Sequence, residues 1–264
     1  MMRGASADAY AAAAGALTGA GDQGRVAQDL FGVADLFRSE PGLRRVATDA
    51  SVAGDAKADL VRGVLSGKVS DQALDVVTTA VAQRWTASRD LGDALEQLGV
   101  VAAVRSTGDD AGRLEDEVFA VGQLVQSSPE LRDALSDPAR TRADKSALVE
   151  NLLGGKALPA TVSLVQQSLS GSHRTVGVAL TAYQKIAAEV RGQGVATVRV
   201  ARALSDADRL RLSGALSRTY GHDVHLNVIV DPEVIGGIRV EIGDDVIDGT
   251  VSSRLDDAGR RLAG

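Results

Sequence analysis

The stretch LFRSEPGLRRVATD, residues 36–49, returns with changes as LVQSSPELRDALSD, residues 124–137. The offset of 88 residues holds without a gap on both sides of this stretch, and it joins fourteen pairs of identical residues. A chance match of two segments with this composition would give roughly three such pairs. The identical pairs are Phe31/Phe119, Val33/Val121, Leu36/Leu124, Ser39/Ser127, Pro41/Pro129, Leu43/Leu131, Arg44/Arg132, Asp49/Asp137, Lys57/Lys145, Leu60/Leu148, Val61/Val149, Leu65/Leu153, Gly67/Gly155 and Lys68/Lys156. One helical module is therefore expected to occur twice in the chain.

Each copy of the module is expected to contain four helices followed by a longer one. Pro41 and Pro129 stand at the first position of a predicted helix, a place that proline favours. Gly67 and Gly155 stand where a helix commonly ends on a left-handed residue. The predicted helices are residues 25–38, 41–48, 53–65, 70–83 and 87–104 in copy one, and residues 113–126, 129–135, 142–153, 159–169 and 175–191 in copy two. The polar residues 106–112 are the expected linker between the copies.

A further helix, residues 9–18, is expected before the first copy, with Ser6-Ala7-Asp8 as its cap. Tyr10, Ala13 and Leu17 fall on one face of this helix, and alanine fills most of the rest. A surface with such small side chains suits packing under other helices, or accepting one. We therefore predict that Tyr10, Ala13 and Leu17 contact a partner.

The pattern changes after residue 194 from helical to alternating. Residues 196–201 and 224–230 alternate as strands around a helix that Ser205 caps, with Asp208 at the third helical position. A hairpin and a terminal helix, residues 252–262, follow. The expected fold is mainly α with a small α/β C-terminal domain. The expected domains are residues 1–108, 109–194 and 195–264.

The hairpin, residues 234–250, is entered through a double glycine. Ile238, Val240 and Ile242 alternate with charged residues, as in a strand with one buried face. Gly236-Gly237 gives backbone freedom, and no side chain, where two segments must pass closely. The turn at Gly243-Asp244-Asp245 can adopt the positive φ that a hairpin needs.

Composition limits the classes of function. The formal net charge of −6 argues against a general binder of nucleic acid or of anionic membranes. The lack of cysteine excludes disulfides, thiol catalysis and cysteine-based zinc sites. No run approaches the roughly 18 apolar residues of a membrane helix, and the first residues do not resemble a secretory signal. The sequence thus predicts a soluble cytoplasmic protein, which can join a membrane complex only through partners.

No group of residues predicts catalysis, a cofactor or a metal site. His222 and His225 point to opposite faces of a strand, which is poor geometry for a metal. The run Gly154-Gly155-Lys156-Ala157 lacks both the first glycine and the hydroxyl residue of a phosphate loop, so it is better explained as a helix end. Asp245 and Asp248 resemble an acidic phosphotransfer site only loosely, since no doubly wound parallel sheet is expected to carry one.

The hairpin resembles the terminal signature of the F-type ATP synthase delta subunit, the family of the mitochondrial oligomycin-sensitivity-conferring protein. Residues 127–132 and 9–13 resemble further parts of that family. The family is typically built with one helical module, so the resemblance is to an enlarged, actinobacterial type. The signature residues, expected to serve structure rather than chemistry, are Ile235, Gly236, Gly237, Arg239, Gly243, Asp248 and Gly249.

The resemblance implies a non-catalytic stator subunit of the proton-translocating enzyme. It implies that the helical part binds N-terminal segments of the alpha subunits in the catalytic head, and that the C-terminal domain binds the end of the b-type stalk subunit. One copy per complex would resist the torque of the rotor, on the cytoplasmic face of the plasma membrane and without inserting into it. Two alternatives are a generic helical-repeat adaptor and a small magnesium-dependent phosphotransfer enzyme that uses Asp245 and Asp248.

Overall fold

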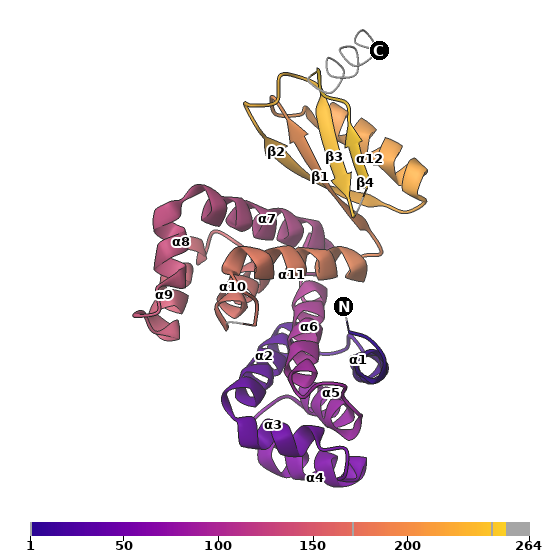
Figure 1. Ribbon diagram of the computed structural model, residues 1–264, viewed down its shortest axis with the longest axis vertical. Coiled ribbons are helices and arrows are strands. Elements are labelled where there is room, and N and C mark those ends of the chain that lie inside the picture. The colour runs from indigo at the N-terminus through magenta and orange to yellow at the C-terminus, as the bar shows by residue number, and fades with distance from the viewer. Residues whose placement is uncertain (1, 171, 244, 252–264) are drawn as a thin grey trace, which may run out of the picture. The chain divides into compact units, whose positions relative to one another are not determined.

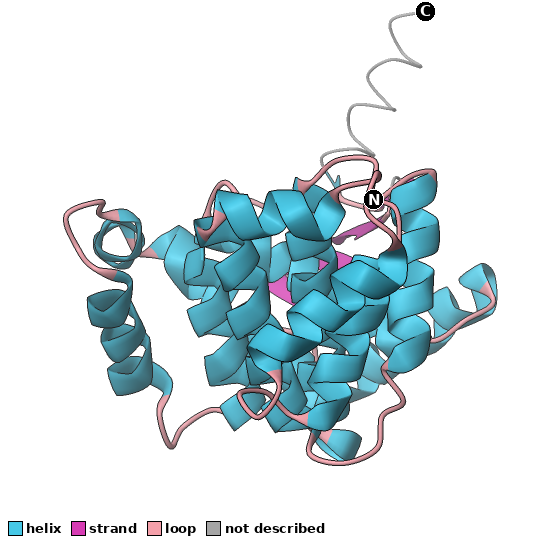
Figure 2. Cartoon of the chain, turned by 90° about the horizontal axis from the view of Figure 1, so that it is seen from below, coloured by secondary structure: helices cyan, strands magenta, loops and turns pink. Residues whose placement is uncertain are grey.

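The computed structural model describes residues 2–170, 172–243 and 245–251. The chain divides into two compact units, Met1–Ala187 and Ala188–Gly264. Helices make up the first unit, and the strands that the structure describes all lie in the second (Figures 1 and 2). The predicted fold class, mainly α with a small α/β C-terminal part, is confirmed. The first unit contains copy one and copy two up to Ala187, near the end of the last helix of copy two, and the division of the copies into two domains at residue 108 stays a prediction.

The helices of the first unit repeat with the period of the sequence. The first part contains α1 (Ala5–Ala16), α2 (Gln23–Ser39), α3 (Pro41–Thr48), α4 (Gly54–Leu65), α5 (Asp71–Ala82) and α6 (Arg89–Arg105). The second part contains α7 (Ala111–Ser127), α8 (Pro129–Ser136), α9 (Arg142–Leu153), α10 (Pro159–Gln167), a 3-10 turn (Ser168–Ser170) and α11 (Val176–Val190). A shift of 88 residues carries α2, α3 and α4 onto α7, α8 and α9 with the same bounds, and α5 onto α10 with its 3-10 turn. The predicted duplication is confirmed at the level of each helix.

Equivalent contacts also recur in the two copies. Asp29 on α2 accepts a hydrogen bond of 2.8 Å from the backbone N–H of Ser70, the residue that precedes α5. At the same place in copy two, Glu117 on α7 accepts one of 2.8 Å from the backbone N–H of Leu158, which precedes α10. A carboxylate at a helix N-terminus satisfies a backbone donor that has no partner within the helix. In each copy, a carboxylate of the first helix, α2 or α7, therefore holds the N-terminus of the fourth helix, α5 or α10.

The close packing of α2 on α6 in copy one depends on a glycine of α6. Phe31 on α2 lies so close to Gly99 that a Cβ there would come within 2.5 Å of its ring. A Cβ on Gly92 would lie 3.6 Å from the carbonyl oxygen of Ala34. Helices α2 and α6 therefore pack side by side at short range (Figure 1). The large buried side chains in this interior include Leu30, Phe37, Leu91, Leu95 and Leu98.

Helix α1 begins at Ala5 rather than at Ala9, so the prediction of its start was wrong. Ser6 does not cap this helix; it lies within the helix, buried, and forms long-range hydrogen bonds. Its hydroxyl donates to Asp90 over 2.6 Å and accepts from the backbone N–H of Thr86 over 2.8 Å. The serine was mistaken for a cap because a hydroxyl near a helix start serves either purpose.

The second unit is a four-stranded sheet with one helix. It contains β1 (Gly194–Val200), α12 (Asp206–Tyr220), β2 (Val224–Val230), β3 (Ile238–Ile242) and β4 (Asp245–Asp248), in the sheet order β2-β1-β3-β4. Strands β1 and β2 are parallel because α12 connects them, and the other neighbours are antiparallel. The predicted order of strand, helix, strand and hairpin is confirmed.

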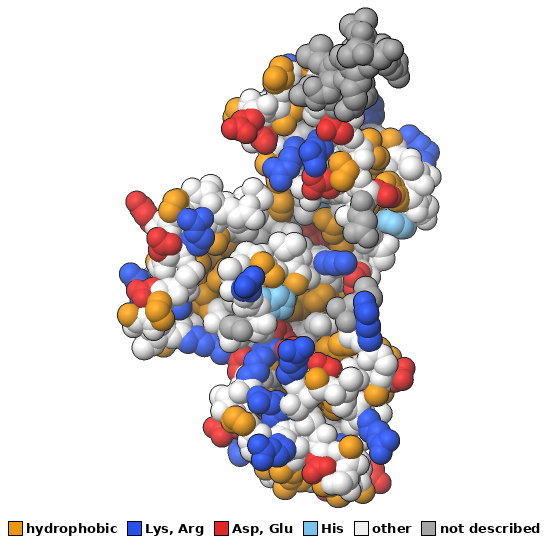
Figure 3. All heavy atoms as spheres, in the orientation of Figure 1, with side chains coloured by type: hydrophobic (Ala, Val, Ile, Leu, Met, Phe, Trp, Pro, Cys, Tyr) orange, Lys and Arg blue, Asp and Glu red, His pale blue; other side chains and the backbone are white. Residues whose placement is uncertain are grey.

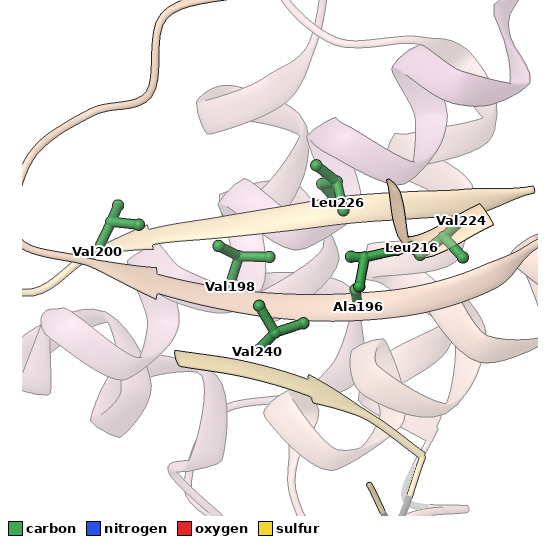
Figure 4. Packing of buried hydrophobic residues seen from close by; sticks show 7 residues of the cluster. All are labelled: Ala196, Val198, Val200, Leu216, Val224, Leu226 and Val240. Atoms are coloured by element: carbon green, nitrogen blue, oxygen red, sulfur yellow. The ribbon is translucent and has the colours of Figure 1, made fainter. Parts of the chain in front are cut away.

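The core of this unit consists of small aliphatic side chains on one face of the sheet (Figure 4). Its members are Ala196, Val198, Val200, Leu216, Val224, Leu226 and Val240. Ser205 caps α12 as predicted, accepting from the backbone N–H of Asp208 over 3.1 Å. Gly221 ends the helix with a φ of 75°. The predicted terminal helix, residues 252–262, lies outside the described residues.

Candidate docking surfaces

Of the three residues that the sequence predicts as partner contacts, Tyr10 and Ala13 lie on α1 and Leu17 directly follows it. Ala13 and Leu17 are buried, and α1 packs mainly on α5. Tyr10 is half-buried. The exposed side of the helix consists of Ala11, Ala12 and Gly15, with Asp8 at one end. Ala13 and Leu17 therefore hold α1 against the neighbouring helices. Contact with a partner stays a prediction, and it depends on Tyr10 and the exposed side of the helix.

The glycines of the hairpin stand where the chain passes itself closely. Gly237 has a φ of 84°, and a Cβ there would lie 2.4 Å from the carbonyl oxygen of Gly249 and 2.8 Å from Cα of Thr250. Gly236 has a φ of 107°, and its carbonyl oxygen accepts from the N–H of Val251 over 3.1 Å. Only glycine adopts such backbone angles readily. The predicted close passage of two segments at the double glycine is confirmed.

The polar signature residues organise the hairpin. Asp248 accepts from the backbone N–H of Thr250 over 2.9 Å and from its hydroxyl over 2.7 Å. These hydrogen bonds, the hydroxyl's first, lower the pKa of Asp248, since they stabilise the charged carboxylate. Arg239 lies opposite Asp248 in the β3–β4 pair and donates to Glu241 over 3.1 Å. Gly243 supplies the turn with a φ of 58°.

The structure does not bring the two candidate phosphotransfer aspartates together. Asp245 and Asp248 stand three residues apart on β4, so their side chains leave opposite faces of the strand. Asp245 accepts from the hydroxyl of Tyr220 over 3.3 Å, and Asp248 is engaged by Thr250. Within the described part of the chain, no group of three histidines or carboxylates could hold a metal ion. Asp245 and Asp248 thus form no catalytic arrangement with each other.

The hairpin also exposes apolar side chains. We call this set the hairpin patch: Ile235, Val246, Ile247 and Val251. Ile235 is 73% exposed, and strand β4, at the edge of the sheet, is exposed along its whole length. Val246 and Ile247 are neighbours on β4, so their side chains leave opposite faces of the strand, on either side of its unpaired edge. An unpaired strand edge flanked by exposed apolar side chains is suited to binding another chain.

Sequence reasoning missed a buried polar cluster at the junction of the two copies. Glu96 on α6 is buried and accepts hydrogen bonds from Arg38 of α2, from the hydroxyl of Tyr183 on α11 and, over 2.7 Å, from Ser172. Burial raises the pKa of Tyr183 and the charge of Glu96 raises it further, so the phenol stays protonated as a donor. The signal in the sequence was an acid on the otherwise apolar face of α6.

Comparison with known proteins decides the family. A profile of the family described as "ATP synthase delta (OSCP) subunit" matches residues 100–262, more than half of the chain. The chain belongs to this family. It is accordingly a non-catalytic subunit of ATP synthase, a membrane-associated complex. The matched region covers copy two and the second unit, while copy one precedes almost all of it.

Curated relatives named "ATP synthase subunit delta" extend the match through copy one. The relative from Nocardioides sp. (strain JS614) is 58% identical over 240 residues, which are 90% of this chain and 87% of the relative. That from Kineococcus radiotolerans is 47% identical, over 92% of this chain and 89% of the relative. The relative from Streptomyces coelicolor is 45% identical, over 99% of this chain and 98% of the relative. The duplicated module is therefore shared with other members of the family.

A solved structure of the Toxoplasma gondii mitochondrial ATP synthase hexamer contains a chain with 15% identity to this one and a TM-score of 0.35. The comparison covers 64% of this chain and 97% of that chain, and at this TM-score the structural similarity is too low to add to the assignment. Among the helices that the structure describes, none is long and apolar enough to pass through a lipid bilayer.

Proposed function

We propose that this protein is the stator subunit that connects the catalytic head of the ATP synthase to its peripheral stalk. The observation that carries the proposal is membership of the delta family, with relatives matched over nearly their full length. Two compact units with separate hydrophobic cores support it, because a connector needs an independent binding surface for each partner. Resistance to the torque of the rotor would let proton flow drive ATP synthesis.

The helical unit would bind the N-terminal segments of the alpha subunits. Small side chains on the outer side of α1 support this, since a second helix can approach Ala11, Ala12 and Gly15 at short range. Ala13 and Leu17, buried under the same helix, would hold that surface in place. The helix carries an acid, Asp8, at its start and no basic residue in its last turn.

The second unit would bind the end of the b-type subunit. The hairpin patch and the edge of β4 support this, because they combine exposed apolar area with unpaired backbone groups. One copy of the chain per complex would then lie at the cytoplasmic face of the plasma membrane. It would be held there by its partners and not by a segment of its own.

The test separates the two ends. The full chain is mixed with the soluble part of b, and binding is compared between the unchanged protein, Val246→Asp in the hairpin patch, and Leu210→Asp, an exposed leucine on α12, as matched control. We expect Val246→Asp to weaken b binding at least about tenfold, as for loss of a central apolar contact, while binding of alpha N-terminal peptides persists. Equal binding of b by all three proteins would remove the second unit from this role.

A further inference from the structure

The duplication has produced the same groove twice. In copy one a groove of about 710 Å³ lies between the α2–α3 corner and the start of α6. In copy two a groove of about 590 Å³ lies between the α7–α8 corner and the start of α11. Seven of the residues that line one groove correspond to residues of the other at the offset of 88. These pairs are Arg38/Gln126, Arg44/Arg132, Ala87/Thr175, Arg89/Gly177, Asp90/Val178, Asp93/Thr181 and Gln97/Lys185.

The copy-one groove is crossed by the chain's own charges. Arg38 on α2 reaches α6, where it donates to the carbonyl oxygen of Gly92 and to Asp93, each over 3.2 Å, and to Glu96. Arg44 donates to backbone carbonyl oxygens at the end of α2. Two of the arginines that line this groove, Arg38 and Arg44, are thus satisfied within the molecule, and Arg38 with its carboxylate partners joins α2 to α6 across the groove; Arg3 and Arg89 line it as well.

Copy two lacks the residues that form this charged clamp. Gln126, Thr181 and Gln184 stand where copy one has Arg38, Asp93 and Glu96. None of the three carries a charge, so no ion pair can join α7 to α11 in this way. The two walls of the copy-two groove are therefore not tied together by the contacts that cross its counterpart.

The helix that forms one wall has also lost its glycines. Leu180 and Ala187 on α11 replace Gly92 and Gly99 of α6, while Phe119 retains the aromatic ring of copy one. In copy one a Cβ at the second of these glycines would collide with that ring. Ala187 carries a Cβ where Gly99 leaves room for the ring, so α11 cannot pack on α7 as closely as α6 packs on α2.

The floor of the copy-two groove is apolar. Val125 of α7 and Val176, Val178 and Ala182 of α11 line it, and Val178, which replaces an aspartate, is 52% exposed. Figure 3 shows hydrophobic side chains in the hollow between the helices α7–α9 and α11. An open apolar groove on one chain is a surface that association with another would remove from water.

The rim of this groove is cationic. Arg132 and Lys185 line it, both exposed, and no acidic side chain does. Neither cation forms an ion pair with a described residue. This is notable in a chain of net charge −6. The lining residues of α11 run from Val176 to Lys185, roughly 14 Å of helix, which matches two to three turns of a helix laid against it.

We propose that the copy-two groove binds an amphipathic helix of another subunit of the same complex, with apolar side chains on its floor and carboxylates at Arg132 and Lys185. The contact follows the helix-in-groove mode, in which residues spaced by three and four positions enter an apolar groove. The copy-one groove does not take such a helix, because its own charges cross it. The two copies thus hold different surfaces. That the partner belongs to this complex rests on the proposed function.

Photocrosslinking in the assembled enzyme tests the proposal. A photoreactive amino acid replaces Val178, or Thr181 on the next turn, and the ATP synthase is purified and irradiated. Leu152, an exposed leucine of α9 outside the groove, is the matched control site. We expect the groove positions alone to crosslink, to a helical segment of another subunit with carboxylates three or four residues apart.

The outcomes separate this proposal from the proposed function. If the unchanged chain does not co-purify with the complex, the proposed function fails. If it does, and the groove positions crosslink no more than Leu152, or crosslink to a second copy of this chain or to a segment without acids, the groove proposal is wrong. A peptide of the crosslinked segment then gives the second measurement. Arg132→Glu with Lys185→Glu should weaken its binding to the full chain at least about tenfold, and unchanged binding would contradict the charge pairing.

Discussion

The substitution Gly99→Ala tests the packing that distinguishes the two copies. Its Cβ would lie 2.5 Å from Cε1 and 2.6 Å from Cδ1 of Phe31, roughly 1 Å inside an ordinary contact. The ring is buried between α2 and α6 and can yield only by disturbing its neighbours. Overpacking of this kind costs about 1–3 kcal/mol, and the gain in helix propensity returns about 1 kcal/mol. We expect a net loss of up to about 2 kcal/mol in the free energy of unfolding of copy one.

The chain contains its own probe for this measurement. Trp85 is the single tryptophan, and its indole N–H donates to the carbonyl oxygen of Ala80 over 2.9 Å, within copy one. Its fluorescence during urea unfolding therefore reports on this copy rather than on the second unit. The matched control is Gly63→Ala in α4, where an added Cβ meets nothing within 4 Å and should raise stability by up to about 1 kcal/mol. If Gly99→Ala also stabilises the chain, the account of close α2–α6 packing is refuted.

Three further substitutions test individual contacts. Tyr183→Phe removes one donor from buried Glu96, so urea unfolding should show a loss of about 1–3 kcal/mol; no loss would mean that the cluster does not join the copies. Glu117→Gln should cost about 1–2 kcal/mol at pH 7. Burial raises the pKa of Glu117, but hydrogen bonds outweigh this and hold the pKa below its usual value. The difference from the unchanged protein should therefore shrink steadily as the pH falls below the ordinary pKa of a glutamate, about 4.3; a difference that stays constant or grows as the pH falls would contradict this. Gly237→Ala should disturb the hairpin, because its Cβ would lie 2.4 Å from the carbonyl oxygen of Gly249. We expect chemical shifts of residues in the second unit to change, and near-native shifts would contradict this expectation.

The duplication and most of the secondary structure could be read from the sequence. Proline at the start of α3 and α8, and glycine after α4 and α9, are local signals that need no tertiary context. The strands β1 and β2 could also be predicted from the sequence, because apolar residues recur at every second position over most of each strand, on both sides of a capped helix. These elements follow from backbone preference and from one buried face.

Contacts between segments far apart in the chain could not be predicted from the sequence. Nothing near Ser6 indicates that its hydroxyl meets Asp90, 84 residues later, so it was taken for a cap. The cluster at Glu96 joins three helices, and its partners become visible only when those helices are placed. The predicted contact residues of α1 show the same limit, since a nearly uniform alanine helix does not reveal which face is buried.

The difference between the two grooves could be predicted from the sequence only in part. Each difference, such as Asp90 against Val178, is present in the aligned copies. Its meaning depends on knowing that both positions line a groove. The repeat provides the comparison, and the fold identifies the surface.

The most direct test of the proposed function is reconstitution of the link itself. Purified catalytic head and the soluble part of b are mixed with and without this chain, and the complexes are separated by size. We predict that the head and b elute together only when the chain is present, and that the chain elutes with each of them alone. Association of the head with b to the same extent without the chain, or a chain that binds neither, would contradict the proposal that this protein connects them.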